Sequence, residues 1–206
     1  MSNLVLLTER NFDELVAQAV QALGRGAVIG YPTETLYGLG VLAGRADAVL
    51  RLRKLKGKRE PMPALVSGVE MASRYALIDE RGARLIKRYW PGPLTLIFNP
   101  SSDILAPVQG DAPGAAMRRS SELFAQSLVV LANEPVASTS ANRGGKEPLE
   151  TAEEIAGEFG NELDLIIDAG PRRGMASTVI DLTGPELKLV REGAIKFEEI
   201  VKVSNG

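Results

Sequence analysis

The chain of 206 residues contains no cysteine and no histidine. Without cysteine it has no disulfide, no thiolate zinc site and no thiol nucleophile. Without histidine it has no imidazole general base, no histidine-dependent serine or cysteine triad and none of the common zinc-hydrolase sites. Carboxylates, hydroxyls, amines, guanidinium groups and the backbone remain. This inventory favours a reaction driven by positioning and charge neutralisation, such as transfer at phosphorus.

Long apolar runs and a strong net charge are also missing, and aromatic residues are few, at 5% of the chain. No run approaches the ~18 residues that a bilayer crossing needs, and the first nine residues lack the cationic start of a signal peptide. We therefore expect a cytoplasmic protein with no membrane contact. Hydrophobic residues make up 45% and charged residues 24% of the chain, as is typical of a folded protein with a substantial core. The net charge of −2 gives no overall indication of nucleic-acid binding.

Strand and helix patterns alternate along the whole chain. Strands are expected at 4–7, 27–31, 63–66, 94–98, 136–138, 165–168, 177–182 and 187–190. Helices are expected at 11–24, 46–55, 69–75, 80–89 and 121–132, and after Thr151. Capping boxes are predicted at Asn11 with Glu14 and at Thr151 with Glu154. The segment 99–114, rich in Pro, Ser, Asp and Gly, is predicted to be a surface loop with little regular structure. Without repeats, linker or second-domain boundary, residues 1–206 are predicted to form one α/β domain with a mixed sheet flanked by helices.

The segment Tyr31–Gly40 is the strongest indication of a binding site. Pro32 ends the apolar strand before it, because proline has no backbone donor for the sheet. Thr33 and Thr35 then place hydroxyls in a loop, and two glycines let the backbone turn or approach a ligand. Polar groups after a buried strand are how open α/β sheets build small-molecule sites. The alternative is an ordinary turn between a strand and a helix.

Cations are concentrated between residues 45 and 60, where two acids accompany seven of them: Arg45, Arg51, Arg53, Lys54, Lys56, Lys58 and Arg59. Such a local field indicates an anionic ligand or RNA, unless it is only the solvated face of a basic helix. The run 54–63 lacks the glycine spacing of a Walker P-loop. Its point charges and guanidinium could still clamp a triphosphate from the sides.

Hydroxyls, an amide and arginines stand at the ends of four further segments. Arg118 follows a run of small residues and is suited to a bidentate contact with a carboxylate, or to pairing with an acid at the surface. The run Ser138–Asn142 offers hydrogen bonds to phosphate or ribose, or is a plain serine-rich turn. Ser177 begins one late strand candidate and Arg191 ends another. Packing alone does not explain this repetition.

Six motifs, in this order, resemble the YrdC-like threonylcarbamoyl-AMP synthase family over residues 10–195. They are 31–40, 56–63, the Trp-Pro-Gly-Pro-Leu-Thr run at 90–95, 138–142, 177–181 and 191–195. The resemblance implies a twisted α/β fold with a concave, positively charged cavity. It implies synthesis of threonylcarbamoyl-AMP from L-threonine, bicarbonate or carbon dioxide, and ATP, with release of pyrophosphate. The product serves to modify the tRNA adenosine beside the anticodon.

The resemblance also implies roles for individual residues. The threonine substrate would lie against Thr33 and Ser138, with its carboxylate on Arg118. The clamp on the ATP phosphates, and so the catalytic group, would be Lys56, Lys58 and Arg59. The remaining nucleotide contacts would be Ser140, Asn142, Ser177 and Arg191. Mg²⁺ would be held mainly by the ATP phosphates, with no metal ligands from the protein. Expected partners are downstream tRNA threonylcarbamoyl transferase proteins, with a possible contact to tRNA or double-stranded RNA.

The sequence departs from the family pattern at two places. Lys58, Arg59, Met62 and Ala64 stand where the family has arginine, proline, lysine and leucine, and the run 119–122 replaces a Pro-Asp-His-Pro pattern. A divergent ATP-using or inactive YciO-like paralogue is therefore an alternative, although the intact Ser138–Asn142 favours the synthase. A second alternative is a non-catalytic RNA-binding module, against which the 5% aromatic content counts. We expect the short, single-domain form of the family.

Overall fold

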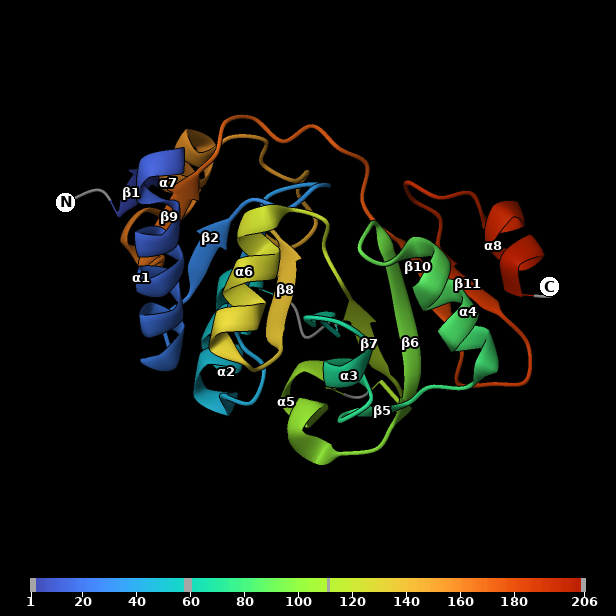
Figure 1. The fold of residues 1–206 in the computed structure, drawn as a ribbon. Coiled ribbons are helices and arrows are strands. Elements are labelled where there is room, and N and C mark those ends of the chain that lie inside the picture. The colour runs from blue at the N-terminus through green and yellow to red at the C-terminus, as the bar shows by residue number, and fades with distance from the viewer. Residues whose placement is uncertain (1–2, 58–60, 111, 205–206) are drawn as a thin grey trace.

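The computed structural model describes residues 3–57, 61–110 and 112–204. One large mixed sheet forms its centre (Figure 1). Within this part of the chain the strand order is β1 (Leu4–Leu6), β9 (Leu165–Asp168), β2 (Ile29–Tyr31), β3 (Gly38–Leu42), β8 (Val136–Ser140), β4 (Ala64–Leu65), β7 (Ala115–Arg118), β6 (Leu94–Pro100), β10 (Thr178–Asp181) and β11 (Lys188–Arg191); β5 (Ala76–Leu77) pairs with β6. The predicted mixed sheet is confirmed.

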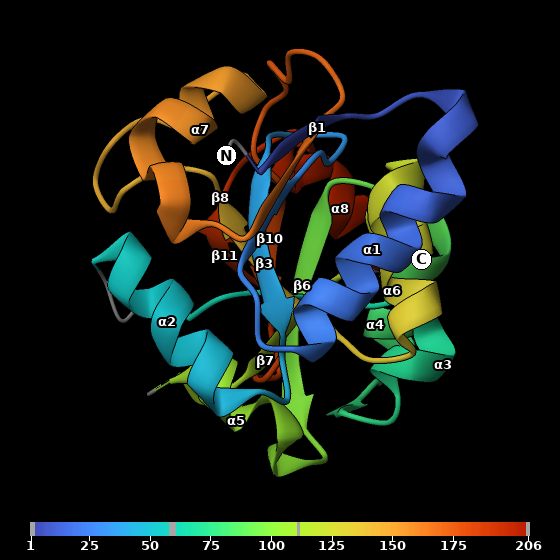
Figure 2. The same cartoon turned by 90° about the vertical axis from the view of Figure 1, so that its left-hand side faces the viewer.

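Helices cover both faces of this sheet, which is why so many of its strands are buried. The helices are α1 (Phe12–Gly24), α2 (Ala46–Lys56), α3 (Val69–Ala72), α4 (Glu80–Tyr89), α5 (Ala106–Gln109), α6 (Leu123–Ala132), α7 (Ala152–Phe159) and α8 (Phe197–Ser204). Figure 2 shows α2, α5 and α7 on one side of the strands and α1, α3, α4 and α6 on the other. None of the helices in the described ranges combines the length and apolar character that a bilayer crossing requires.

One predicted capping box is confirmed and the other is wrong. At the start of α7 the Glu154 amide donates to the Thr151 hydroxyl at 3.2 Å, and the Thr151 amide donates to the Glu154 carboxylate at 3.1 Å. Asn11 does not cap α1 with its side chain. Its side-chain oxygen instead accepts from the amide and hydroxyl of Thr8, around a short 3-10 turn. Glu14 therefore plays no part in a cap.

The glycine-rich end of the threonine loop is a strand, contrary to the prediction. Gly38 and Gly40 belong to β3, which pairs antiparallel with both β2 and β8. A side chain at Gly40 would place its Cβ 2.7 Å from the Tyr31 ring. Glycine is required here because the ring lies so close to the neighbouring backbone, an approach that sequence patterns do not reveal.

Several short elements were not predicted. The segment 99–114 contains the end of β6, a 3-10 turn at Asp103–Leu105 and α5, so its description as an irregular loop is wrong. The two-residue strand β5 and helix α8 were also missed. In α8 the buried Ile200 packs into the core. Such short pieces form because neighbouring elements bury them, and their own sequence patterns are weak.

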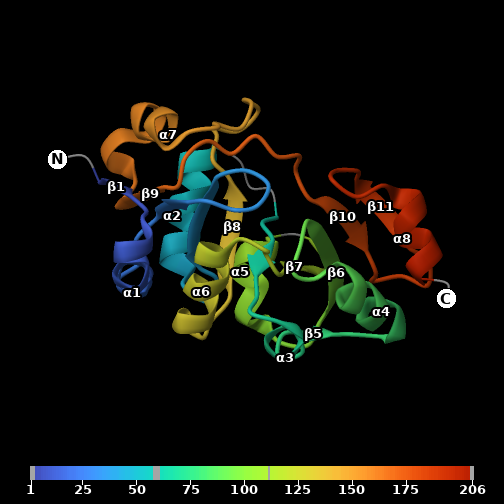
Figure 3. The same cartoon turned by 45° about the horizontal axis from the view of Figure 1, so that its top comes forward.

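The strand order and register bring the predicted site residues into one neighbourhood. Ser138 and Ser140 are two residues apart on β8 and share one face of it. Leu65 of β4 lies opposite Arg118 of β7. Val179 of β10 lies opposite residue 95 of β6 and residue 191 of β11. The connection from β9 to β10 crosses the end of the sheet at which these residues lie (Figures 1 and 3).

Candidate functional site

A cavity of about 770 Å³ lies at this end of the sheet. The described residues that line it include eight of the ten predicted site residues: Thr33, Lys56, Arg118, Ser138, Ser140, Asn142, Ser177 and Arg191. The other two, Lys58 and Arg59, lie outside the described residues. Distant segments thus bring cations, hydroxyls and an amide into one hollow, as expected if the strand ends meet at one edge.

The hydroxyl of Thr33 is used within its own loop. It donates to the Leu36 carbonyl at 2.6 Å, accepts from the amides of Thr35 and Leu36 at 3.2 Å each, and lies 2.9 Å from the Thr35 hydroxyl. Such turns, in which a threonine hydroxyl replaces a backbone partner, fix the path of the chain. The geometry supports a role for Thr33 in shaping the wall of the cavity, with its hydroxyl already occupied.

Ser138 presents a hydrogen-bond donor to the cavity. Tyr31, fully buried beneath it, donates its phenolic proton to the Ser138 hydroxyl oxygen at 2.7 Å. Burial raises the pKa of Tyr31 to about 12, so the phenol stays protonated and keeps donating at neutral pH. The proton of Ser138 is therefore directed to another acceptor, such as a substrate oxygen. The supporting position of Tyr31 was missed, because its contact with Ser138 joins residues 107 positions apart.

A second cluster forms where α2 ends beside the end of β8. The Lys56 ammonium donates to the Asn142 side-chain oxygen at 2.6 Å and to the Ser140 carbonyl at 2.8 Å. The Ser140 hydroxyl donates to the same Asn142 oxygen at 2.6 Å. Gly57 ends α2 in the left-handed conformation, with φ of 67°, which turns the chain away directly after Lys56. These partners hold the Lys56 charge at the wall of the cavity.

A third cluster lies across the cavity, on β6, on β11 and directly before β10. The hydroxyls of Thr95 and Ser177 are 2.9 Å apart, and Arg191 donates to the Ser177 carbonyl through Nε at 3.2 Å and Nη2 at 2.9 Å. Partial burial, and then repulsion from Arg118, lowers the pKa of the Arg191 guanidinium. Thr95 lines the cavity and was not singled out, although its motif was recognised.

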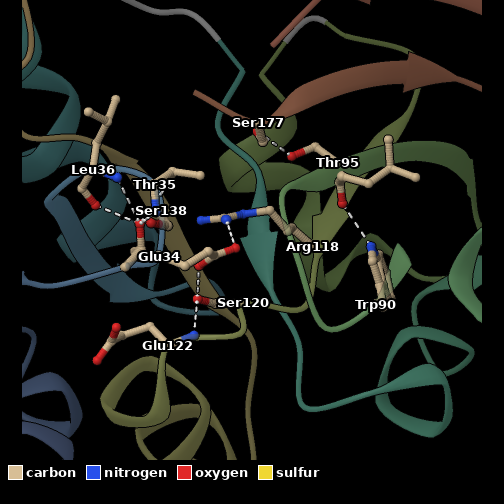
Figure 4. Close-up of polar contacts among 12 residues, drawn as sticks. Glu34, Thr35, Leu36, Trp90, Thr95, Arg118, Ser120, Glu122, Ser138 and Ser177 are labelled. Atoms are coloured by element: carbon tan, nitrogen blue, oxygen red, sulfur yellow. Dashed lines mark hydrogen bonds and ion pairs between the residues drawn. The ribbon is translucent and has the colours of Figure 1, made fainter. Parts of the chain in front are cut away.

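Arg118 pairs with an acid, which was one of the two predicted uses of this residue. The prediction placed the pair at the surface, whereas it lies inside the protein. Its Nη1 lies 2.5 Å from the Glu34 carboxylate, and the side chains are only 7% and 16% exposed. The Ser120 hydroxyl donates to the other oxygen of Glu34 (Figure 4). Glu34 was missed because its partner, 84 residues away, is brought to it by the sheet. The available signal was a carboxylate between two loop threonines.

The described cations of this run, between residues 45 and 57, do not act as one exposed patch. Arg45 pairs with Asp47 and Arg51 with Asp164, each at 2.7 Å. Arg53 donates to backbone carbonyls at the start of α5. These arginines are therefore used largely to fix α2 to its neighbours. Among the described cations of the run, Lys56 is the one that lines the cavity.

Comparison with known proteins assigns the chain to a family. The family model Sua5/YciO/YrdC, described as telomere recombination, matches residues 21–193. The chain belongs to this family. Its relatives include the threonylcarbamoyl-AMP synthase of Pyrococcus abyssi, 34% identical over 98% of this chain and 61% of its own length. That of Bacillus subtilis is 34% identical over 93% of this chain and 57% of its own length. The chain thus spans about three fifths of these two relatives.

Solved structures of the family share the fold. The Pyrococcus abyssi Sua5 structure complexed with L-threonine is 35% identical, with a TM-score of 0.92 over 97% of this chain and 60% of that one. The structure of Escherichia coli YciO is 29% identical, with a TM-score of 0.87, and is covered over 100% of its length. The predicted family and twisted α/β architecture are therefore confirmed.

Proposed function

We propose that this chain is an L-threonylcarbamoyladenylate synthase, a nucleotidyltransferase acting on L-threonine, bicarbonate or carbon dioxide, and ATP. The observation that carries the proposal is the gathering of Lys56, Arg118 and Arg191 with the hydroxyls of Ser138 and Ser140 in one cavity. Two supports come from relatives: many bear this activity in their names, and the Sua5 of Pyrococcus abyssi was solved with L-threonine.

The reaction suits a chain without histidine. The threonine amine adds to carbon dioxide, forming a nitrogen–carbon bond and losing a proton to water, and so becomes a carbamate. A carbamate oxygen then attacks the α-phosphorus of ATP, and the bond to the departing pyrophosphate breaks. No side chain need act as general base if the amine enters unprotonated. Orientation of the two substrates provides most of the acceleration.

Within the cavity we assign the substrates to different walls. The carboxylate of threonine binds Arg118, with Ser138 donating to the amino acid. The triphosphate lies along Lys56, Ser140 and Asn142; the family motif assigns Lys58 and Arg59, which lie outside the described residues, to the same ligand. The ribose side of the nucleotide lies toward Ser177 and Arg191. Cationic groups near phosphorus stabilise the charge that grows there in the transition state.

We assign Mg²⁺ to this site as a companion of the nucleotide. Among the described residues no group of three carboxylate or other metal-binding side chains is close enough to hold an ion. Asp181 contributes a carboxylate to the cavity wall, and one of its oxygens accepts from Thr183. Mg²⁺ bound mainly through the ATP phosphates would supply further positive charge at the phosphorus.

Transfer of the product to tRNA adenosine by a separate transferase completes the proposed role, with direct tRNA contact as a further proposal. The main alternative is a divergent paralogue. It is favoured by the similarity of the fold to Escherichia coli YciO, which is 29% identical with a TM-score of 0.87. Met62, at the second lysine position of the family motif, is also buried and brings no charge to the site.

Pyrophosphate release tests the proposal and separates it from the alternative. We expect release only when ATP, L-threonine and bicarbonate are all present, with threonylcarbamoyl-AMP detected by mass spectrometry. Omission of any one substrate should abolish the signal. Release that does not depend on threonine, or no release under any condition, would reject the synthase assignment and favour the paralogue.

A further inference from the structure

The guanidinium of Arg118 is supported by a carboxylate that does not face the cavity. Arg118 lines the cavity, whereas Glu34 and Ser120 are not among the described residues that form its wall. Figure 4 shows Glu34 between Arg118 and Ser120, with the guanidinium extending toward Ser138. The acid thus lies behind the arginine, on the side away from the space that a substrate would occupy.

This arrangement uses Nη1 of the guanidinium and leaves Nε and Nη2 for another partner. In the described part of the chain, the hydrogen bond that Arg118 makes through its side chain is from Nη1 to Glu34, at 2.5 Å. A guanidinium has five N–H donors in a fixed plane, so Nε and Nη2 can serve a second carboxylate. A partner on Nη1 reduces the rotamer freedom of Arg118 that substrate binding would otherwise have to freeze.

Both carboxylate oxygens of Glu34 accept hydrogen bonds. Its second oxygen accepts from Ser120, whose hydroxyl oxygen also accepts from the Glu122 amide at 3.2 Å. Glu122 in turn lies 3.7 Å from Arg172, on the connection between β9 and β10. The chain of contacts therefore joins the threonine loop, the start of α6 and that connection behind Arg118.

We propose that Glu34 is a positioning residue that aims Arg118 at the substrate carboxylate, with Ser120 fixing the reach of Glu34. This inference rests on the proposed function and deepens it. The reach of the side chain matters more than its charge, because a negative charge behind Arg118 by itself weakens attraction for a second carboxylate. Glutamine can accept from Arg118 and donate to Ser120, so it preserves the geometry; aspartate keeps the charge and loses the reach.

Two substitutions separate reach from charge. Glu34→Asp is expected to raise the KM for L-threonine at least tenfold with little change in kcat, because the lost contact is made equally in the ground state and the transition state. The KM of Glu34→Gln for L-threonine is expected to stay within threefold of that of the unmodified chain. The KM for ATP should be unchanged in both. Ser120→Ala should raise the threonine KM in the same direction, to a smaller extent.

The matched control is Asp79→Glu. Asp79 also serves an arginine and a second donor, Arg81 and the Gly82 amide, but at the start of α4. We expect this change by one methylene to lower the melting temperature and leave the threonine KM unaltered.

The outcomes are distinguishable. A threonine KM that is unchanged in Glu34→Asp, or raised equally in Glu34→Gln, would overturn the positioning role while leaving the proposed function intact. No threonine-dependent pyrophosphate release by the unmodified chain would overturn both. If Glu34→Asp does not fold, as judged by circular dichroism, Ser120→Ala decides, and an unchanged threonine KM there overturns the inference.

Discussion

Gly174 offers the sharpest test of how the threonine loop is held. It lies on the connection from β9 to β10, where its backbone crosses the loop that carries Thr33 and Thr35. A Cβ at Gly174 would lie 2.3 Å from the Thr35 carbonyl oxygen and 2.9 Å from its carbonyl carbon. The backbone conformation at Gly174 does not require glycine, so Gly174→Ala adds a steric clash with backbone and little else.

The expected magnitude follows from these distances. Ordinary contact begins at 3.4 Å, so the two segments must separate by about 1 Å. Forcing a methyl group into a packed site costs about 1–3 kcal/mol. A loss of about 2 kcal/mol lowers the Tm of a domain of this size by about 4–8 °C. A 1 Å displacement of a positioning element can also cost about 100-fold in rate.

The assay compares Gly174→Ala with Gly157→Ala. Gly157 lies in α7 with no atom within 4 Å of an added Cβ, so alanine there should stabilise the protein by about 0.5–1 kcal/mol. We expect Gly174→Ala alone to lower the Tm and the kcat/KM for L-threonine. If the two variants match each other in both measurements, the connection does not hold the threonine loop and the reasoning is wrong.

Two further predictions concern single contacts. The folded-state pKa of Tyr31 is about 12, above its ordinary value of 10.0. The contribution of this difference to the free energy of unfolding is fully present below pH 10. About 3 kcal/mol of it is lost as the pH rises toward 12. The stability difference between the unmodified chain and Tyr31→Phe in urea titrations should shrink over that window, and a constant difference would contradict the assignment. Asn142→Ala removes an acceptor from both Lys56 and Ser140; the KM for ATP should rise about tenfold, and an equal rise for threonine would place the phosphates elsewhere.

Much of the fold followed from local patterns. Helix α4 occupies the predicted residues 80–89, and the Thr151 capping box is present. Apolar runs that end in proline, serine or arginine correctly marked the strand ends that line the cavity. These features depend on neighbours in sequence, so a sequence reveals them.

The remainder depended on contacts that no local pattern contains. Gly38 and Gly40 looked like loop residues, because the Tyr31 ring that makes glycine necessary there acts across a strand pair. The pairing of Glu34 with Arg118 needs β7 to be brought to the threonine loop. Strand β5 is two residues long and exists only through its pairing with β6.

A crystal structure of the chain with L-threonine and a non-hydrolysable ATP analogue tests the central claim most directly. The account predicts both ligands in the one cavity, with the threonine carboxylate about 2.7–3.2 Å from the free nitrogens of Arg118 and the phosphates beside Lys56. Threonine bound away from Arg118, or a nucleotide bound outside the cavity, would contradict it.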